Sequence, residues 1–169
     1  MKMKMFLLLY CAMLLTGCAS ASMSAPGTEP PPEPMMQIGN PWVDYDTLNE
    51  AEEACGFNSP LPLTVAGSYT AQSFRVMNGE LLEVVYRDGE FEVMVRICPG
   101  ENQDISGVYE EADTVEEMSV NGITVTVKNI DCSVLHLISA DGCSYCLYAP
   151  NGYQDSAAME FLNFICFPG

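Results

Sequence analysis

Two cysteines three positions apart, Cys143 and Cys146, have the C-x-x-C spacing of thiol redox sites. In thioredoxin-like proteins that motif opens a helix, whose N-terminus lowers the pKa of the thiol. Here alternating apolar and polar residues predict a strand from Cys143 to Ala149. Residues three apart in a strand point to opposite faces and lie about 10 Å apart, too far for a disulfide. Thiol redox chemistry is therefore the alternative function and not the leading one.

Zinc binding is a second chemistry that these residue types allow, because Cys132, His136, Cys143 and Cys146 form a Cys3His set. A two-residue turn at 141–142 would pair position 136 with 147 and position 140 with 143. Cys132, His136 and Cys143 would then share one face of the sheet, whereas Cys146 would point to the other. The set is a weak metal candidate, and an ordinary strand histidine is the competing interpretation of His136.

Disulfides are the third option, since six cysteines follow position 38: Cys55, Cys98, Cys132, Cys143, Cys146 and Cys166. An even number outside the cytoplasm suggests disulfides, but six cysteines allow 15 pairings. Cys55 and Cys166 each end a predicted helix, and they could form a disulfide if the two helices pack side by side. Free buried thiols are the competing interpretation.

Calcium and hydrolase sites find little support in the remaining residues. The segment from Pro99 to Glu117 is rich in Asp and Glu. It lacks the alternating acidic spacing and central glycine of an EF-hand loop. A Ser-His-Asp site would have to use His136, and no G-x-S-x-G motif accompanies it. We therefore expect no cofactor and no catalytic residue, and we expect partner contacts at the 99–117 loop.

The elements that would position these residues are those of an α+β domain. Thr47 and Glu50 form a capping box that begins a helix, and Gly56 is placed to end it. From Ala71 the apolar period changes to two, which predicts an antiparallel meander of about seven strands. A helix from about Asp155 to Cys166 follows and packs on one face of the sheet. Trp42, the only tryptophan, is expected to pin the start of the domain to the core.

Four turn dipeptides set the predicted register: Asn78-Gly79, Asp88-Gly89, Asn121-Gly122 and Asp141-Gly142. A two-residue turn at 88–89 would pair Arg87 with Glu90 and place the apolar residues on one face, with Glu83, Arg87, Glu90, Glu92 and Arg96 facing water. At 78–79 a two-residue turn would bury Arg75. We therefore predict a three-residue loop there, which turns Phe74 and Val76 inward.

Several short runs resemble a known family. They are Pro99-Gly100, Asp104-Ile105-Ser106-Gly107 with Tyr109, Val120-Asn121-Gly122, Gly142 to Leu147, Asn40-Pro41-Trp42 and Ala51 to Phe57. They resemble a domain of unknown function found in lipoproteins and membrane-anchored proteins of Gram-positive bacteria, some linked to anti-sigma regulators. The resemblance covers about residues 39 to 165 and implies no catalytic residue. Members of that family carry glycine or serine where this chain has Cys143 and Cys146.

The N-terminus resembles a bacterial lipoprotein signal. Lys2 and Lys4 precede an apolar run from Phe6 to Leu15, and Leu15-Thr16-Gly17-Cys18 matches a lipobox. The resemblance implies cleavage before Cys18 and lipidation of its thiol, so that the protein is anchored to the cell membrane and faces outside the cytoplasm. We therefore divide the chain into a signal peptide (1–17), a lipidated cysteine with a proline-rich linker (18–38) and one domain (39–169).

The charge limits the partners. Without residues 1–17 the chain keeps four basic residues against 23 acidic ones, a formal charge of −19. Such a chain is unsuited to nucleic acid, whose binding requires cationic surface. The sequence thus predicts a lipid-anchored, non-catalytic domain that binds an unknown protein or small ligand. The alternative is a thiol redox or metal-binding protein that uses Cys143 and Cys146.

Overall fold

An open antiparallel sheet of nine strands forms the centre of the computed structural model, which describes residues 39–154 and 156–167. The predicted signal peptide, Cys18 and the predicted linker lie outside the described residues. Two helices accompany the sheet in this described part of the chain, which forms one compact unit. The elements are β1 (Trp42–Tyr45), α1 (Leu48–Cys55), β2 (Thr64–Val65), β3 (Tyr69–Met77), β4 (Leu81–Asp88), β5 (Phe91–Pro99), β6 (Thr114–Val120), β7 (Ile123–Ile130), β8 (Ser133–Ala140), β9 (Cys143–Ala149) and α2 (Ala157–Cys166).

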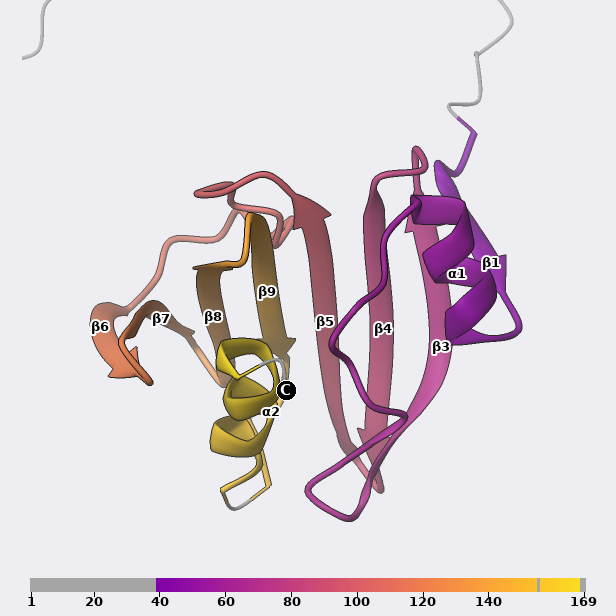
Figure 1. Ribbon diagram of the computed structural model, residues 1–169. Coiled ribbons are helices and arrows are strands. Elements are labelled where there is room, and N and C mark those ends of the chain that lie inside the picture. Colours follow the sequence, from indigo (N-terminus) through magenta and orange to yellow (C-terminus); the bar gives the residue numbers. More distant parts are fainter. Residues whose placement is uncertain (1–38, 155, 168–169) are drawn as a thin grey trace, which may run out of the picture. The chain divides into compact units, whose positions relative to one another are not determined.

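The strand order corrects the predicted single meander. It is β1-β3-β4-β5-β9-β8-β7-β6, and β2 pairs with β3 (Figure 1). The chain therefore makes one meander from β3 to β5, crosses to the far edge, and returns as a second meander that ends with β9 beside β5. The segment from 100 to 113 makes that crossing. The prediction was wrong here because it assumed that β5 and β6, neighbours in sequence, also pair. It also missed the short strands β1 and β2.

The hairpin turns mostly follow their sequences. Met77 pairs with Leu81, which confirms the three-residue loop at 78–80, and both Phe74 and Val76 are buried. The turns at 121–122 and 141–142 have two residues, as predicted. Asp88 pairs with Phe91, so the loop there is Gly89-Glu90 and the predicted β4–β5 register was wrong by two residues. Gly89 has a φ of 58°, and glycine at the first central position selects this alternative turn.

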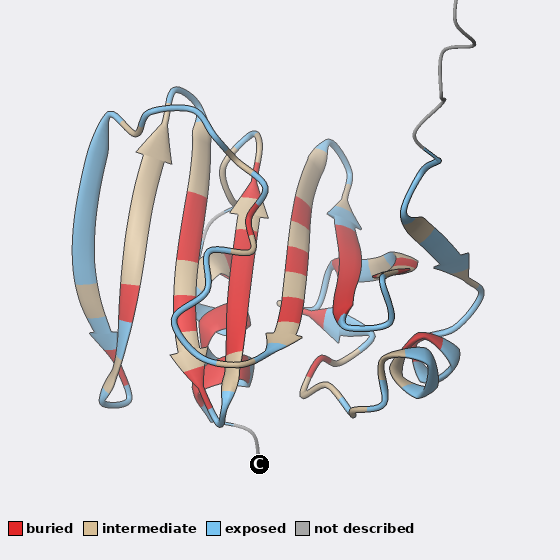
Figure 2. Cartoon of the chain, turned by 90° about the horizontal axis from the view of Figure 1, so that it is seen from above, coloured by how far each residue is buried: buried red, intermediate tan, exposed pale blue. Residues whose placement is uncertain are grey.

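Both helices pack on the same face of the sheet, over different strands (Figure 1). The capping box of α1 is confirmed, with Thr47 and Glu50 bonding each other's backbone N–H groups and Gly56 at the C-cap. In α2 the stripe with Phe161, Leu162 and Ile165 is buried. The ring of Phe161 meets the edges of Tyr69 and Tyr86 at centroid distances of 5.5 and 5.1 Å. The core therefore lies between the helices and the front of the sheet, in its central strands (Figure 2).

The back of the sheet, away from the helices, differs most from expectation. A continuous row of register partners crosses it: Asp44, Arg75, Glu83, Arg96, Cys146, Leu137, Thr126 and Glu117. The prediction placed Glu83 and Arg96 in water. In the structure Glu83 is fully buried and only 17% of the Arg96 side chain is exposed. Part of this face is covered because the 100–113 loop is bonded to it.

Candidate functional site

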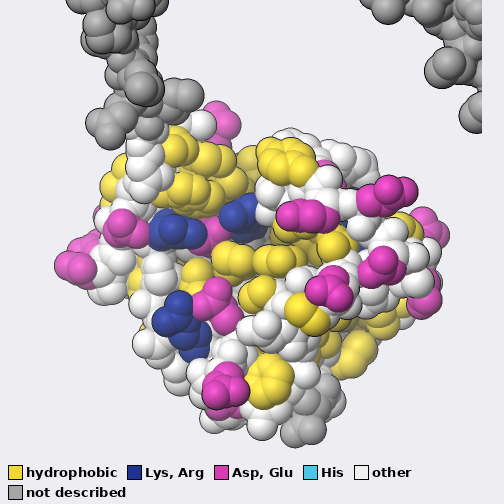
Figure 3. Space-filling view, turned by 180° about the vertical axis from the view of Figure 1, so that it is seen from behind, with side chains coloured by type: hydrophobic (Ala, Val, Ile, Leu, Met, Phe, Trp, Pro, Cys, Tyr) yellow, Lys and Arg dark blue, Asp and Glu magenta, His cyan; other side chains and the backbone are white. Residues whose placement is uncertain are grey.

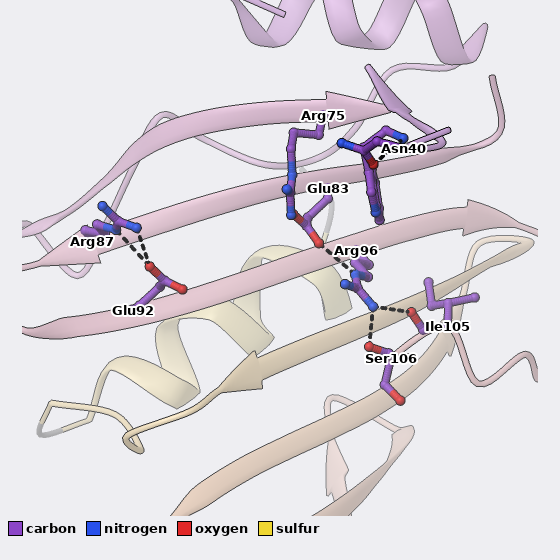
Figure 4. A network of polar contacts seen from close by, with 9 residues as sticks. Asn40, Arg75, Glu83, Arg87, Glu92, Arg96, Ile105 and Ser106 are labelled. Atoms are coloured by element: carbon purple, nitrogen blue, oxygen red, sulfur yellow. Dashed lines mark hydrogen bonds and ion pairs between the residues drawn. The ribbon is translucent and has the colours of Figure 1, made fainter. Parts of the chain in front are cut away.

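Arg96 attaches the 100–113 loop to the back of the sheet. Its Nη1 donates hydrogen bonds to the carbonyl oxygens of Ile105, at 3.2 Å, and of Ser106 (Figure 4). Gly107 is needed beside this contact, because its φ is +65° and a Cβ there would lie 2.8 Å from Arg96 Nη1. The loop therefore has a fixed path over the middle of β5 instead of hanging free at the sheet edge.

Glu83 holds Arg96 in place from the other side. Its two carboxylate oxygens accept from the Nε atoms of Arg75 and Arg96, both at 2.8 Å. The Trp42 ring packs against both guanidinium groups, whose Cζ atoms lie 4.9 and 5.5 Å from its centroid. Trp42 therefore covers an ion-pair network on the back face. The prediction that it pins the start of the domain to the hydrophobic core was wrong. The buried carboxylate has two cationic partners, which is what makes its burial tolerable.

Two serines attach the first part of the loop. Ser144 Oγ donates to the Gly100 carbonyl at 2.7 Å and accepts from the backbone N–H of Gln103 at 3.0 Å. Ser139 Oγ accepts from the backbone N–H of Asn102 at 2.8 Å. Because β8 and β9 bond successive loop amides, residues 100–103 lie along the end of these strands.

Asp104 closes the turn that follows. Its Oδ1 accepts from the Ser106 amide and hydroxyl at 3.1 and 2.6 Å, and its Oδ2 accepts from Lys128 Nζ at 3.0 Å. Partial burial would raise the pKa of the Asp104 carboxyl, but the hydrogen bonds from Ser106 and Lys128 outweigh it and lower the pKa below its ordinary value. Asp104 is therefore a carboxylate at neutral pH.

Between this loop and strands β6–β8 lies an open groove with a volume of about 670 Å³. Figure 3 shows the back face, on which acidic side chains gather on the side that carries the loop and β6. Most of the groove lining consists of carboxylates, amides and hydroxyls. The lining residues are Glu101, Asn102, Gln103, Asp104, Glu117, Gly122, Ile123, Thr124, Thr126, Leu137, Ile138 and Ser139. Such a surface can hold a ligand that donates many hydrogen bonds or carries positive charge.

The structure does not bring the four candidate zinc ligands together. Cys132 is exposed in the β7–β8 turn, and Cys146 is buried on the back face. His136 faces the helices, where its Nδ1 lies 3.1 Å from the Tyr153 hydroxyl. As the register argument predicted, His136 pairs with Leu147 and Ala140 with Cys143. Over residues 39–154 and 156–167, no three His, Cys, Asp or Glu side chains are grouped as a metal site.

The thiols are free, and burial raises the pKa of most of them, which lowers their reactivity. Cys55, Cys98, Cys132, Cys143, Cys146 and Cys166 form no disulfide in the structure. A disulfide between Cys55 and Cys166 would require the two helices to pack side by side. Instead, α1 packs on β1, β3 and β4, whereas α2 lies in front of β8 and β9 (Figure 1). Burial raises the pKa of the Cys146 thiol to about 12. A thiol so rarely ionised is a poor redox nucleophile.

Sequence reasoning predicted an irregular loop from 99 to 117, which was wrong at its end because residues 114–117 belong to β6. It also missed the sheet residues that shape the groove. Thr124 and Thr126 alternate with apolar residues, as ordinary solvent-facing strand positions do, and no local pattern predicts that the loop crosses this face of the sheet. The Asp104-x-Ser106-Gly107 run was a usable signal, since Asp and Ser before glycine favour a tight turn bonded by their side chains.

Comparison with known proteins adds no relative: no family model, no curated protein and no solved structure matches this chain. Neither helix of the described part of the chain is long and apolar enough to span a membrane.

Proposed function

We propose that this protein is a lipid-anchored, non-catalytic binding domain that faces outside the cytoplasm and takes its partner in the groove on the back of the sheet. The Leu15-Thr16-Gly17-Cys18 sequence supports the location. Several acyl chains on Cys18 would hold the domain firmly, since each buried CH₂ contributes about 0.8 kcal/mol.

The groove is the observation that carries the binding role. It is the point where the longest loop meets the sheet, and a network of hydrogen bonds and ion pairs holds that loop in place. A binding surface that is already ordered loses less entropy when a ligand arrives. The main chain of the loop is already held by hydrogen bonds to Ser139 and Ser144, so the loop is suited to binding a partner.

The lining also suits binding better than catalysis. It includes three acidic residues, Glu101, Asp104 and Glu117, and several amides and hydroxyls, but no histidine, cysteine or lysine. The lowered pKa of Asp104 keeps that carboxyl ionised, whereas a general acid at neutral pH needs a raised one. An ionised carboxylate is an acceptor for cationic or hydrogen-bond-donating partners.

Capture of the partner from membranes tests this proposal. Wild-type lipoprotein is compared with Thr124→Arg, which places a long cationic side chain in the groove, and with Thr70→Arg on β3, an exposed threonine outside the groove lining. Both variants change the net charge equally. We expect the wild type and Thr70→Arg to enrich the same partner and Thr124→Arg to lose it. Equal enrichment by all three proteins would show that the groove is not the binding site.

A further inference from the structure

Strand β6 leaves one edge of the sheet open. It is the last strand in the order and pairs only with β7, and no other strand in the described part of the chain covers its outer side. Five of its seven residues are exposed, apart from the half-buried Met118 and the buried Val120 (Figure 2). An uncovered edge of this length offers a row of backbone donors and acceptors to another extended segment.

The turn at 121–122 tells which backbone groups point outward. A β-turn bonds the carbonyl of its first residue to the amide of its fourth, so Val120 and Ile123 form a hydrogen-bonded pair. Bonded pairs alternate with unbonded ones along an antiparallel ladder. The amides and carbonyls of Val115, Glu117 and Ser119 therefore point away from β7. The side chains of the same three residues lie on the back face, where Glu117 lines the groove.

Charge selects the occupant of this edge. Glu110, Glu111, Asp113, Glu116 and Glu117 are all exposed on β6 or just before it. A second copy of β6 that paired antiparallel about the middle of the strand would set Glu117 against Glu117 of the other copy, and like charges on facing strands are destabilising. The chain's own N-terminal segment is unsuited too, because residues 5–38 contain no Lys or Arg and several prolines.

We propose that β6 accepts an extended segment of a partner protein that is rich in Lys and Arg, as a tenth strand of the sheet. This inference rests on the proposed function and names the partner class for the same site. The outward backbone groups of Val115, Glu117 and Ser119 bond the added strand. Facing residues on neighbouring strands have Cβ atoms about 5 Å apart, so alternate basic side chains reach Glu117 and extend toward the carboxylates of the groove.

A peptide of nine residues that alternates lysine and threonine is the probe, and its affinity for the full lipoprotein in detergent is measured by fluorescence anisotropy. Two matched probes have glutamate in place of lysine, or N-methyl groups on alternate amides. The first keeps the backbone and reverses the charge, and the second keeps the charge and blocks the strand bonds. We expect the lysine peptide to bind and each matched probe to bind at least about tenfold more weakly.

Protein variants separate the same two contributions. Val115→Pro removes one outward amide, and Glu117→Lys reverses the charge at the centre of the edge. Each is expected to weaken binding of the lysine peptide at least about tenfold. Equal binding of the lysine and N-methylated peptides would overturn strand addition even if Val115→Pro did not fold. No binding of the lysine peptide, together with membrane capture that Thr124→Arg abolishes, would overturn this inference and leave the proposed function standing.

Discussion

Neutralising Glu83 should destabilise the domain strongly, because this carboxylate is the shared partner of Arg75 and Arg96. Glu83→Gln keeps the size of the side chain and removes its charge. Loss of one partner from a buried ion pair costs about 3 to 5 kcal/mol of the free energy of unfolding. The Arg75 side chain is 32% exposed and can be solvated by water, whereas that of Arg96 is 17% exposed. We therefore expect the lower end of the range, about 3 kcal/mol.

The matched control is Glu92→Gln, one strand away. The Arg87–Glu92 pair also joins β4 to β5, but 60% of the Arg87 side chain and 27% of the Glu92 side chain are exposed. Exposed pairs contribute about 0 to 1 kcal/mol. The two variants thus make the same chemical change on paired strands, and they differ mainly in burial and in the number of partners.

Urea denaturation followed by circular dichroism measures both free energies of unfolding. For a domain of this size, 3 kcal/mol corresponds to a fall in Tm of about 10 °C. Hydrogen exchange provides a second measurement, because release of Arg96 should speed exchange in the 104–107 turn. If Glu83→Gln and Glu92→Gln cost the same within about 0.5 kcal/mol, the ion-pair network does not hold the loop to the sheet and this reasoning is refuted.

Three further predictions concern other residues. Burial lowers the pKa of His136 to about 4, so the unfolded chain binds more protons than the folded one between about pH 6.5 and pH 4, and stability falls as the pH drops through that window. Denaturation experiments at about pH 7 and pH 4 measure how much of the free energy of unfolding is lost between these two pH values. His136→Gln should lose about 3 kcal/mol less of it than the wild type does, and identical losses would contradict the neutral buried histidine. Iodoacetamide should alkylate the exposed Cys132 first in the native protein, as mass spectrometry of the wild type and Cys132→Ser can show, whereas fast labelling of Cys146 would oppose the structure. Labelled fatty acid should enter the wild-type protein and not Cys18→Ser, and equal incorporation would disprove the lipobox.

Local features of the fold could be predicted because short runs of residues determine them. Thr47 and Glu50 bond each other within one helical turn, and Asn121-Gly122 alone closes its hairpin. The faces of β4 and β5 were also predicted correctly, since a register error of two residues leaves every side chain on the same face. The same error hid the ion pair, because it set Glu83 beside Met94 and not beside Arg96.

The topology and the groove depend on contacts between distant segments, and sequence reasoning did not reach them. Pairing of β5 with β9 joins residues about fifty positions apart, and no local pattern marks such a pair. The groove exists only because residues 100–104 lie over strands that follow them in the chain. What the sequence did indicate was the acidic loop as the place for partner contacts, and the structure locates that loop on the back face.

Site-specific photocrosslinking in living cells tests the central claim, that the groove holds the partner, most directly. A photoreactive amino acid is placed at Thr124 in the groove and, as the matched position, at Thr70 on β3. We predict one dominant crosslinked species from position 124 in the membrane fraction and none from position 70. No crosslink at position 124, or the same pattern from both positions, would contradict the claim.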